Sequence, residues 1–329
     1  MTGPRGGARG ERLHINLGAV CNNNCLFCQE GDRAARLRNN SAMTSERVRW
    51  MLESHRGAEE VCFTSGEPTT NPRLLDFVRW ARALGYPRIS LMSNGRRLAY
   101  RAYASRLVRA GLNRVCLSVH GDTAELHDGL TRTPGSFEQT VAGLGAVARL
   151  KGPGLDLHTS TVVTVRNLPA LAEVYRFLRD RGVDQVVFNA LQPCGRAATL
   201  FEQIAPRYSV VADRFRDFVA RLGTGPVMAF LVDVPLCVTE GLPELNRGYV
   251  ERYFHYDLAA HAAVLAARKP DRQAVGEGAG LALVRRGDLD AVARSKRPAC
   301  DGCRYTSGCP GVWDHYVAHY GWHEFVPVQ

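Results

Sequence analysis

Three cysteines crowd one short stretch near the start of the chain, AVCNNNCLFCQEGDRAA at positions 19–35. Cys21, Cys25 and Cys28 are spaced C-x3-C-x2-C, with three asparagines between the first two and Phe27 beside the third. Three thiolates leave a tetrahedral zinc ion one ligand short, whereas a cubic iron-sulfur cluster can keep one iron open for a substrate. The residues alone allow either a zinc ion completed from elsewhere or such a cluster.

A second group of thiols stands near the end of the chain. Cys300, Cys303 and Cys309 are spaced C-x2-C-x5-C, and the isolated Cys237 follows an apolar run that is typical of a strand. Cys237 is therefore the candidate for a fourth ligand, and without it a cluster here would have an open iron. Zinc suits spaced cysteine pairs equally well.

The other three cysteines have different surroundings. Cys62 and Cys116 lie inside expected strands, where a thiol serves as a small core side chain. Cys194 lies in the loop after the sixth expected strand, which makes it the candidate for a catalytic thiol.

Composition indicates a globular protein with a large core. The 329 residues are 45% hydrophobic, the formal net charge is +10, and the arginines are spread along the whole length. Residues 1–11 read as a disordered lead-in without an apolar signal segment, and the most apolar later run is too short to cross a membrane. We expect a cytoplasmic protein. In that reducing compartment, clustered cysteines more often hold metal than form disulfides.

Strand and helix patterns must position these residues. Short β-branched runs alternate with segments of 3.6-residue apolar spacing, which indicates βα units around a parallel sheet. Such a sheet places working groups at the carboxyl ends of its strands. We expect an α/β unit at residues 12–224 and a small Cys-rich module at 225–329. The six expected strands span 12–18, 60–65, 87–93, 114–120, 157–165 and 184–190.

CNNNCLFC resembles the signature of radical S-adenosylmethionine (radical SAM) enzymes. The resemblance implies a partial (β/α)6 TIM-like barrel in which the three cysteines hold a 4Fe-4S cluster, with the open iron binding SAM. TSGEPTTNP resembles the Gly-Gly-Glu-Pro loop of that family, with Ser65 in place of the first glycine and Gly66, Glu67 and Pro68 retained. A carboxylate such as Glu67 can accept hydrogen bonds from the SAM ammonium group.

Further motifs follow in the family's order over roughly residues 12–200. Ser93 and Asn94 after the third expected strand, and Ser118 at the end of the fourth, resemble polar strand ends near SAM. LHDGLTRTPGSFEQT resembles a family segment that offers Arg132 as a carboxylate partner. Turn or capping roles remain open for each of these residues.

CDGCRYTSGC resembles part of the SPASM and twitch extensions, which carry auxiliary 4Fe-4S clusters. The full SPASM pattern has a further cysteine where this chain has Trp313. The resemblance therefore implies one auxiliary cluster, held by Cys300, Cys303, Cys309 and the candidate Cys237.

The resemblance implies an oxidoreductase reaction, in which a 5′-deoxyadenosyl radical formed from SAM removes hydrogen from a substrate. A ribosomally made peptide is the favoured substrate; a sugar, aminocyclitol or nucleotide, or a tRNA, is the alternative. A flavodoxin or ferredoxin is the expected electron donor. The competing class is a zinc protein whose basic surface binds nucleic acid, which the Gly-Glu-Pro loop and the strand order disfavour.

Overall fold

Residues 12–38, 43–222, 227–242, 254–257, 283–285 and 293–329 are described by the computed structural model. The lead-in expected at residues 1–11 lies outside the described residues. All six expected strands are present within a parallel sheet, and a seventh strand continues it. The seven are β1 (Arg12–Asn16), β2 (Glu60–Thr64), β3 (Arg88–Ser93), β4 (Arg114–Ser118), β5 (Asp156–Val163), β6 (Gln185–Ala190) and β7 (Met228–Val232).

The sheet runs in the order β7-β6-β5-β4-β3-β2-β1-β8-β9. Strand β8 (Phe254–Asp257) lies parallel to β1, and β9 (Leu283–Arg285) lies antiparallel to β8. Strand β7 pairs with β6, so the barrel sheet extends past the boundary expected after residue 224. The sequence placed this run in the appended module because the last hundred residues lack the regular βα alternation, yet β7 pairs with β6 and buries Ala229 and Leu231.

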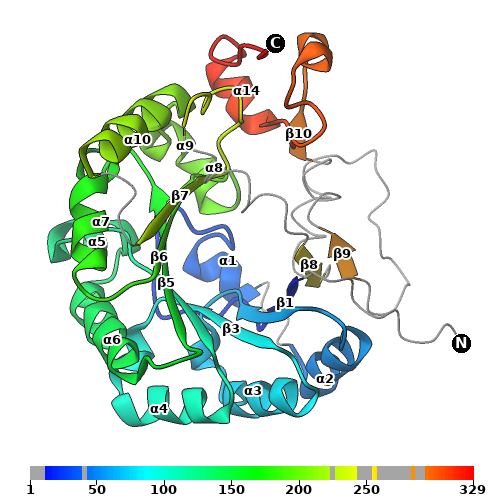
Figure 1. Ribbon diagram of the computed structural model, residues 1–329, viewed down its shortest axis with the longest axis vertical. Coiled ribbons are helices and arrows are strands. Elements are labelled where there is room, and N and C mark those ends of the chain that lie inside the picture. The colour runs from blue at the N-terminus through cyan, green and yellow to red at the C-terminus, as the bar shows by residue number, and fades with distance from the viewer. Residues whose placement is uncertain (1–11, 39–42, 223–226, 243–253, 258–282, 286–292) are drawn as a thin grey trace, which may run out of the picture.

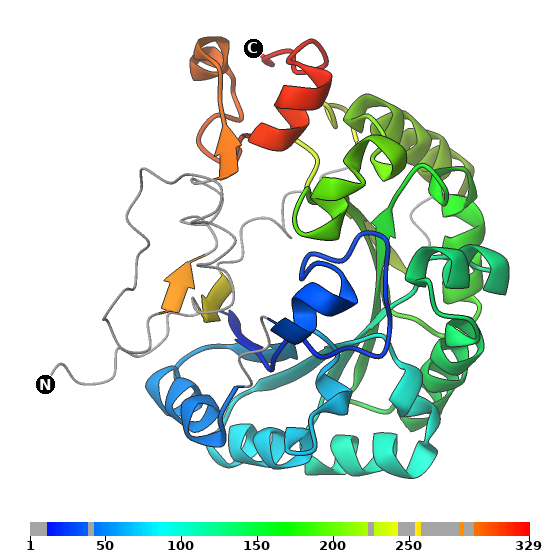
Figure 2. The ribbon, with the colours of Figure 1, turned by 180° about the vertical axis from the view of Figure 1, so that it is seen from behind.

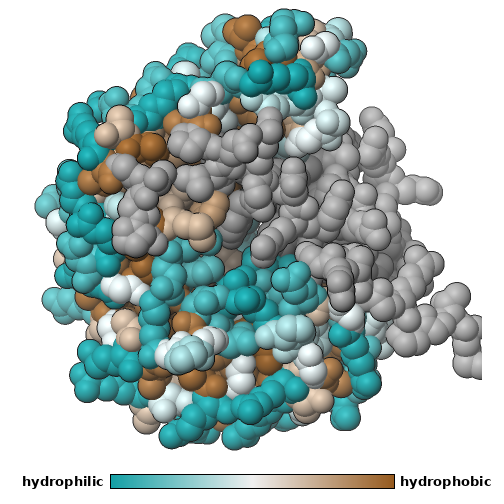
Figure 3. Space-filling model, in the orientation of Figure 1, coloured by the Kyte–Doolittle hydropathy of each residue, from teal (hydrophilic) through white to brown (hydrophobic). Residues whose placement is uncertain are grey.

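Helices cover the outer face of the curved sheet (Figure 1). In α3 the residues Leu74, Phe77, Val78 and Ala81 are buried at i, i+3, i+4 and i+7, which is the apolar stripe of a helix packed on a sheet. The outer rim is largely hydrophilic (Figure 3). The outer helices are α2 (Ser45–Ser54), α3 (Leu74–Ala83), α4 (Arg101–Ala110), α6 (Ser136–Leu150), α7 (Leu171–Arg179) and α10 (Tyr208–Leu222).

The inner face of the sheet carries a charged layer at the amino ends of the strands. Arg12 and Arg114 each lie 2.8 Å from a carboxylate oxygen of Glu60, and Arg114 also lies 3.2 Å from Asp156. Buried charges of this kind are tolerated when they are paired. The layer fills one end of the barrel and leaves the carboxyl end for the connecting loops.

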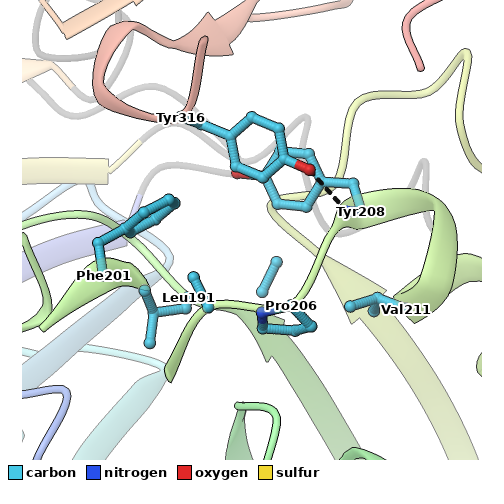
Figure 4. Close-up of a pocket in the computed structure, with 8 residues that line it drawn as sticks. Leu191, Phe201, Pro206, Tyr208, Val211 and Tyr316 are labelled. Carbon is cyan, nitrogen blue, oxygen red and sulfur yellow. Dashed lines mark hydrogen bonds between the residues drawn. The ribbon is translucent and has the colours of Figure 1, made fainter. Parts of the chain in front are cut away.

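The C-terminal segment packs against the barrel through aromatic side chains. The Tyr316 ring of α14 (Asp314–Tyr320) stacks on Tyr208 with centroids 4.0 Å apart, and its hydroxyl accepts a 2.8 Å hydrogen bond from the Tyr208 amide. Phe201 and Leu191 line the same apolar contact (Figure 4). Before α14, β10 (Arg294–Ser295) pairs with β11 (Val312–Trp313). No helix in the described part of the chain is long and apolar enough to span a membrane.

Candidate metal and cofactor site

The cysteine loop connects β1 to α1 (Arg33–Arg38). The loop and α1 lie inside the curve of the sheet (Figures 1 and 2). Its backbone is fixed by α5 (Ala124–Thr131): the Asn24 amide donates to the Thr131 carbonyl and the Leu26 amide to the Leu130 carbonyl, both at 3.0 Å. Phe27 is buried and packs edge-on against His120, with ring centroids 4.6 Å apart. The loop is thereby held at the carboxyl end of the sheet.

The three asparagines between the first two cysteines are hydrogen-bonding anchors. The Asn94 side chain donates to the Asn22 side-chain oxygen at 2.6 Å and to Cys21 Sγ at 3.8 Å. The Asn23 amide donates to Cys21 Sγ at 3.3 Å. Asparagine suits this loop because its side chain accepts and donates while its own carbonyl remains available.

Three arginines bind the same run of asparagines. Arg36 donates to the Asn23 carbonyl at 2.9 Å, and Arg96 donates to the Asn23 side-chain oxygen at 2.9 Å. Arg196 donates to both oxygens of Asn24, at 2.8 and 3.0 Å. Sequence reasoning missed these contacts, because arginines spread along the chain looked like surface charge; the one available signal was the asparagine run.

The three thiols lie close enough to act on one another electrostatically. Burial raises the pKa of Cys25, and the neighbouring Cys21 and Cys28 raise it further, whereas the Arg36 guanidinium opposes them. Burial also raises the pKa of Cys21 and of Cys28. Within the described residues no three His, Cys, Asp or Glu side chains converge on a single metal ion. A cluster needs no such convergence, because each thiolate binds a different iron.

The Gly-Glu-Pro loop packs directly on the cysteine loop. Gly66 has φ +55°, and a Cβ there would lie 2.4 Å from the Val20 carbonyl oxygen and 2.5 Å from that of Gly18. The Glu67 amide donates to the Val20 carbonyl at 2.7 Å. The glycine is therefore required for close approach of two backbones within the protein.

Glu67 ties the ends of β2 and β3 together. Its carboxylate is 2% exposed and accepts from the Thr69 amide at 3.1 Å, the Thr69 hydroxyl at 2.6 Å, Ser93 Oγ at 2.7 Å and the Asn94 amide at 2.7 Å. Burial raises the pKa of Glu67, and these hydrogen bonds oppose that rise. The structure thus brings Glu67, Ser93 and Asn94 together, while the expected bond to a ligand ammonium stays a prediction.

Ser65 occupies a backbone conformation that favours glycine. Its φ is +71°, and its hydroxyl donates to a Glu30 side-chain oxygen at 2.6 Å. Pro68 begins the short helix η1 (Pro68–Thr70). The serine at this position thus gains a contact with the cysteine loop, because Glu30 follows Cys28 by two residues.

The segment that contains Arg132 is organised by Asp128. The Asp128 carboxylate accepts from the Gly135 and Phe137 amides, both at 2.7 Å, and from Ser136 Oγ at 2.8 Å. Burial opposes ionisation of Asp128, but the hydrogen bonds from Ser136 and these amides outweigh it and lower the pKa. Arg132 itself is exposed and ends α5 in the left-handed conformation.

Two further predicted residues lie at strand ends. Ser118 ends β4 beside Ser160 of β5. Cys194 is partly exposed in the loop after β6, which packs on the cysteine loop: a Cβ on Gly195 would lie 2.1 Å from the Gln29 carbonyl oxygen. These positions face the same end of the sheet as the thiols.

The four C-terminal candidates also come together. Burial raises the pKa of Cys237 to about 11, and Cys309, Cys303 and Cys300 each raise it as well. The segment carrying Cys237 follows β7 and is joined to the other three cysteines through Glu240, which pairs with Arg304 and accepts from the Tyr305 hydroxyl. Cys237 therefore lies near enough to the other three thiols to interact with them electrostatically, and its role as a fourth ligand stays a prediction.

A chain of polar contacts links the two cysteine regions. Gln29 donates to Gln192 at 2.8 Å, and Gln192 donates to Asp233 at 2.5 Å. Asp233 pairs with Arg294 at 3.0 Å, with side chains 8% and 2% exposed. The Arg294 guanidinium lies 4.1 Å from the Trp313 ring centroid. No sequence pattern indicated these contacts.

Comparisons with known proteins agree with this geometry. Residues 15–178 match the model of the Radical SAM superfamily. The AdoMet-dependent heme synthase of Oleidesulfovibrio alaskensis is 34% identical over 160 residues, which cover 48% of this chain and 40% of that protein. A probable GTP 3′,8-cyclase of Metallosphaera sedula is 30% identical over 193 residues, covering 58% and 59%. The match thus spans about half the length of these curated relatives.

Solved structures resemble the fold over more of the chain. Streptococcus suis SuiB bound to S-adenosylmethionine aligns with a TM-score of 0.59 and 13% identity over 96% of this chain and 76% of that one. Native anSMEcpe with bound AdoMet aligns with a TM-score of 0.54 and 19% identity over 66% and 64%. These solved structures share the fold, and the family match over residues 15–178 shows that the chain belongs to the radical SAM superfamily.

Proposed function

We propose that this chain is a radical SAM enzyme whose Cys21, Cys25 and Cys28 hold the SAM-binding 4Fe-4S cluster. The observation that carries the proposal is the loop that holds three partly buried, mutually interacting thiols at the carboxyl end of the sheet. Members of this superfamily bind SAM and a 4Fe-4S cluster. When bound, the cluster supplies the electron that cleaves SAM, and the protein binds, orients and shields the reactants.

The Gly-Glu-Pro loop would orient SAM beside the cysteine loop. The proposed contacts are Ser65, Gly66, Glu67, Pro68, Ser93, Asn94, Ser118 and Arg132. Because Glu67 is buried, the SAM ammonium would reach its carboxylate by replacing the hydroxyl of Thr69 or Ser93. Asn94 joins that carboxylate to Cys21, so it would align SAM with the cluster. Cys194 remains the candidate thiol for substrate chemistry.

Cys237, Cys300, Cys303 and Cys309 would hold one auxiliary 4Fe-4S cluster. The electrostatic coupling of Cys237 with the other three supports a four-thiol set. Backbone amides also donate to these sulfurs: Gly311 to Cys309 Sγ and Val328 to Cys303 Sγ, both at 3.4 Å. Such donors suit sulfur ligands that carry negative charge.

A peptide is the favoured substrate. SuiB, which aligns with 96% of this chain, also has a structure bound to the precursor peptide SuiA, which aligns with a TM-score of 0.52 over 66% of this chain. A structure of anSMEcpe likewise contains a bound peptide. An electron donor of the flavodoxin or ferredoxin type would complete the reaction.

Sequence identity favours a small-molecule substrate as the second candidate. The curated relatives with the higher identities are a heme synthase and probable GTP cyclases. These matches cover 48% and 58% of this chain. Incubating the enzyme with candidate peptides, GTP or tetrapyrroles, and following deuterium transfer into deoxyadenosine, separates the two candidates.

The proposal is tested by SAM cleavage under anaerobic reduction. Wild-type protein should release 5′-deoxyadenosine and methionine, and Cys21→Ala/Cys25→Ala/Cys28→Ala protein should release neither. Cys62→Ala is the matched control, because Cys62 is a buried thiol inside β2 and outside the cysteine loop. Product formation by the triple variant at the wild-type rate would refute the assignment.

A further inference from the structure

Arg36 is a buried cation without a carboxylate partner in the described part of the chain. Its side chain extends from α1, and the residue is 3% exposed. One terminal nitrogen donates to the Asn23 carbonyl at 2.9 Å, while Nε is buried and has no hydrogen-bond partner. A guanidinium taken out of water in this way is costly unless an anion compensates it.

Arg36 binds the cysteine loop between its first two thiols, at the Asn23 carbonyl, so its charge lies beside these thiols. Its charge acts on Cys21, Cys25 and Cys28 alike, whereas that of Arg196 acts chiefly on Cys28. Helix α1 lies inside the curve of the sheet directly after the loop (Figure 2). The guanidinium reaches back to the loop, where it donates to the Asn23 carbonyl. Neutral thiols cannot compensate the charge, but three thiolates on an iron-sulfur core can.

We propose that Arg36 is the buried counter-ion of the SAM-binding cluster, holding the loaded loop together and favouring the reduced state. The inference rests on the proposed function of the cysteine loop. It assigns Arg36 a positioning and electrostatic role with no contact to substrate. An opposite charge nearby stabilises the more negative of two states, and the cluster gains negative charge on reduction.

This role predicts that Arg36→Met stabilises the iron-free protein and weakens the iron-loaded protein. In the iron-free form, Arg36→Met removes an uncompensated buried charge and should raise the melting temperature. In the iron-loaded form, the same change removes the counter-ion and one charged hydrogen bond. Iron should then be lost to a chelator about tenfold faster or more, and the reduction potential should fall.

The experiment compares wild type, Arg36→Met, Arg36→Lys and Arg33→Met. Arg33 is exposed on the same helix and serves as the matched control. Melting temperature is measured on iron-free protein; iron release into chelator and the midpoint of an electron paramagnetic resonance titration are measured on reconstituted protein. Arg36→Lys keeps the charge, so its potential should stay near wild type, and Arg33→Met should match wild type throughout.

Three results would overturn the inference. A fall in melting temperature of both Arg36→Met and Arg36→Lys iron-free proteins would show a purely structural role. Unchanged iron release and potential in Arg36→Met would show that the cluster does not depend on the charge. If Arg36→Met does not fold, the reduction potential of Arg36→Lys is the test. A potential below that of wild type would contradict a role for the charge. Wild-type protein that binds no iron would instead refute the proposed function itself.

Discussion

The two cysteine regions are built in different ways. In the first, Cys21, Cys25 and Cys28 come from one loop that lies inside the barrel and is bound by arginines and asparagines. In the second, one thiol comes from the segment after β7 and three from the C-terminal segment, and cross-links between these segments bring them together. The first site is thus formed by a loop within a scaffold, whereas the second forms only when two segments dock.

This difference teaches where each region is vulnerable. The first should fail when the packing of its loop is disturbed, because the loop backbone is hydrogen-bonded to β2, α5 and α8 (Arg196–Thr199) and lies against Gly66 and Gly195. The second should fail when a contact between segments is removed. The predictions below follow from this comparison, in order of decreasing effect.

The largest effect is expected from Cys237→Ala. Removing the one ligand that comes from the β7 side should leave three thiols in a single segment and abolish the auxiliary signal in electron paramagnetic resonance of the reduced protein. Iron and sulfide content, measured beside wild type, gives the second readout. A variant with two clusters and an unchanged auxiliary signal would show that Cys237 is a bystander.

The next prediction compares the stability loss caused by one glycine substitution near each cysteine region. Gly66→Ala adds a Cβ within 2.5 Å of two carbonyl oxygens at positive φ, so we expect a loss of at least about 3 kcal/mol in the free energy of unfolding. Gly302→Ala lies between two C-terminal cysteines, where a Cβ meets no atom within 4 Å, and should change stability by less than about 0.5 kcal/mol. Denaturant unfolding measures both, and equal losses would contradict the comparison.

The two ion pairs between the docked segments should differ in their contribution to stability, because one is buried and the other is partly exposed. Arg294→Met breaks the buried pair with Asp233 and should cost about 3 to 5 kcal/mol. Arg304→Met breaks the partly exposed pair with Glu240 and should cost much less, because solvent screens this pair. Protease sensitivity of the C-terminal segment gives the local readout. A larger effect of Arg304→Met than of Arg294→Met would show that the pair with Glu240, and not the pair with Asp233, is the main contact between the segments.

A smaller loss than those of Gly66→Ala and Arg294→Met is expected in acid. Burial lowers the pKa of His127 to about 4, with Arg96 adding to the shift and Asp128 opposing it. Since an unfolded histidine titrates near about 6.5, the unfolded chain takes up this proton first and stability falls between about pH 6.5 and 4. We expect His127 to cost about 2 kcal/mol between pH 7 and pH 5. His127→Gln should flatten that part of the unfolding profile; an unchanged slope would contradict the shift.

The sequence predicted much of the scaffold and the ligand groups, because these depend on local patterns. Alternation of β-branched and helical segments located six strands, and cysteine spacing located both thiol groups. The pairing of β7 with β6 depends on contacts between segments, so the sequence did not place this strand in the sheet. The roles of Arg36 and Arg196 also depend on the fold, since an isolated arginine in sequence carries no sign of burial.

For the Gly-Glu-Pro loop, the sequence predicted the position of the motif but not its contacts. Its position after the second expected strand was predicted, with Gly66 retained in it. The partner of that glycine is the cysteine loop backbone, and the partners of Glu67 are neighbouring hydroxyls and amides. A motif can thus be located from sequence while its contacts remain undetermined, because many side chains at strand ends can fill the same role.

The central claim is that the cysteine loop holds the cluster that cleaves SAM, and the most direct test is to divide the iron between the two cysteine regions. Wild type, Cys21→Ala/Cys25→Ala/Cys28→Ala and Cys300→Ala/Cys303→Ala/Cys309→Ala are reconstituted anaerobically, and iron and 5′-deoxyadenosine are measured. We predict about eight irons in wild type and about four in each variant, with SAM cleavage lost only in the first. SAM cleavage that persists in the first variant, or stoichiometric zinc in place of iron at the cysteine loop, would contradict the account.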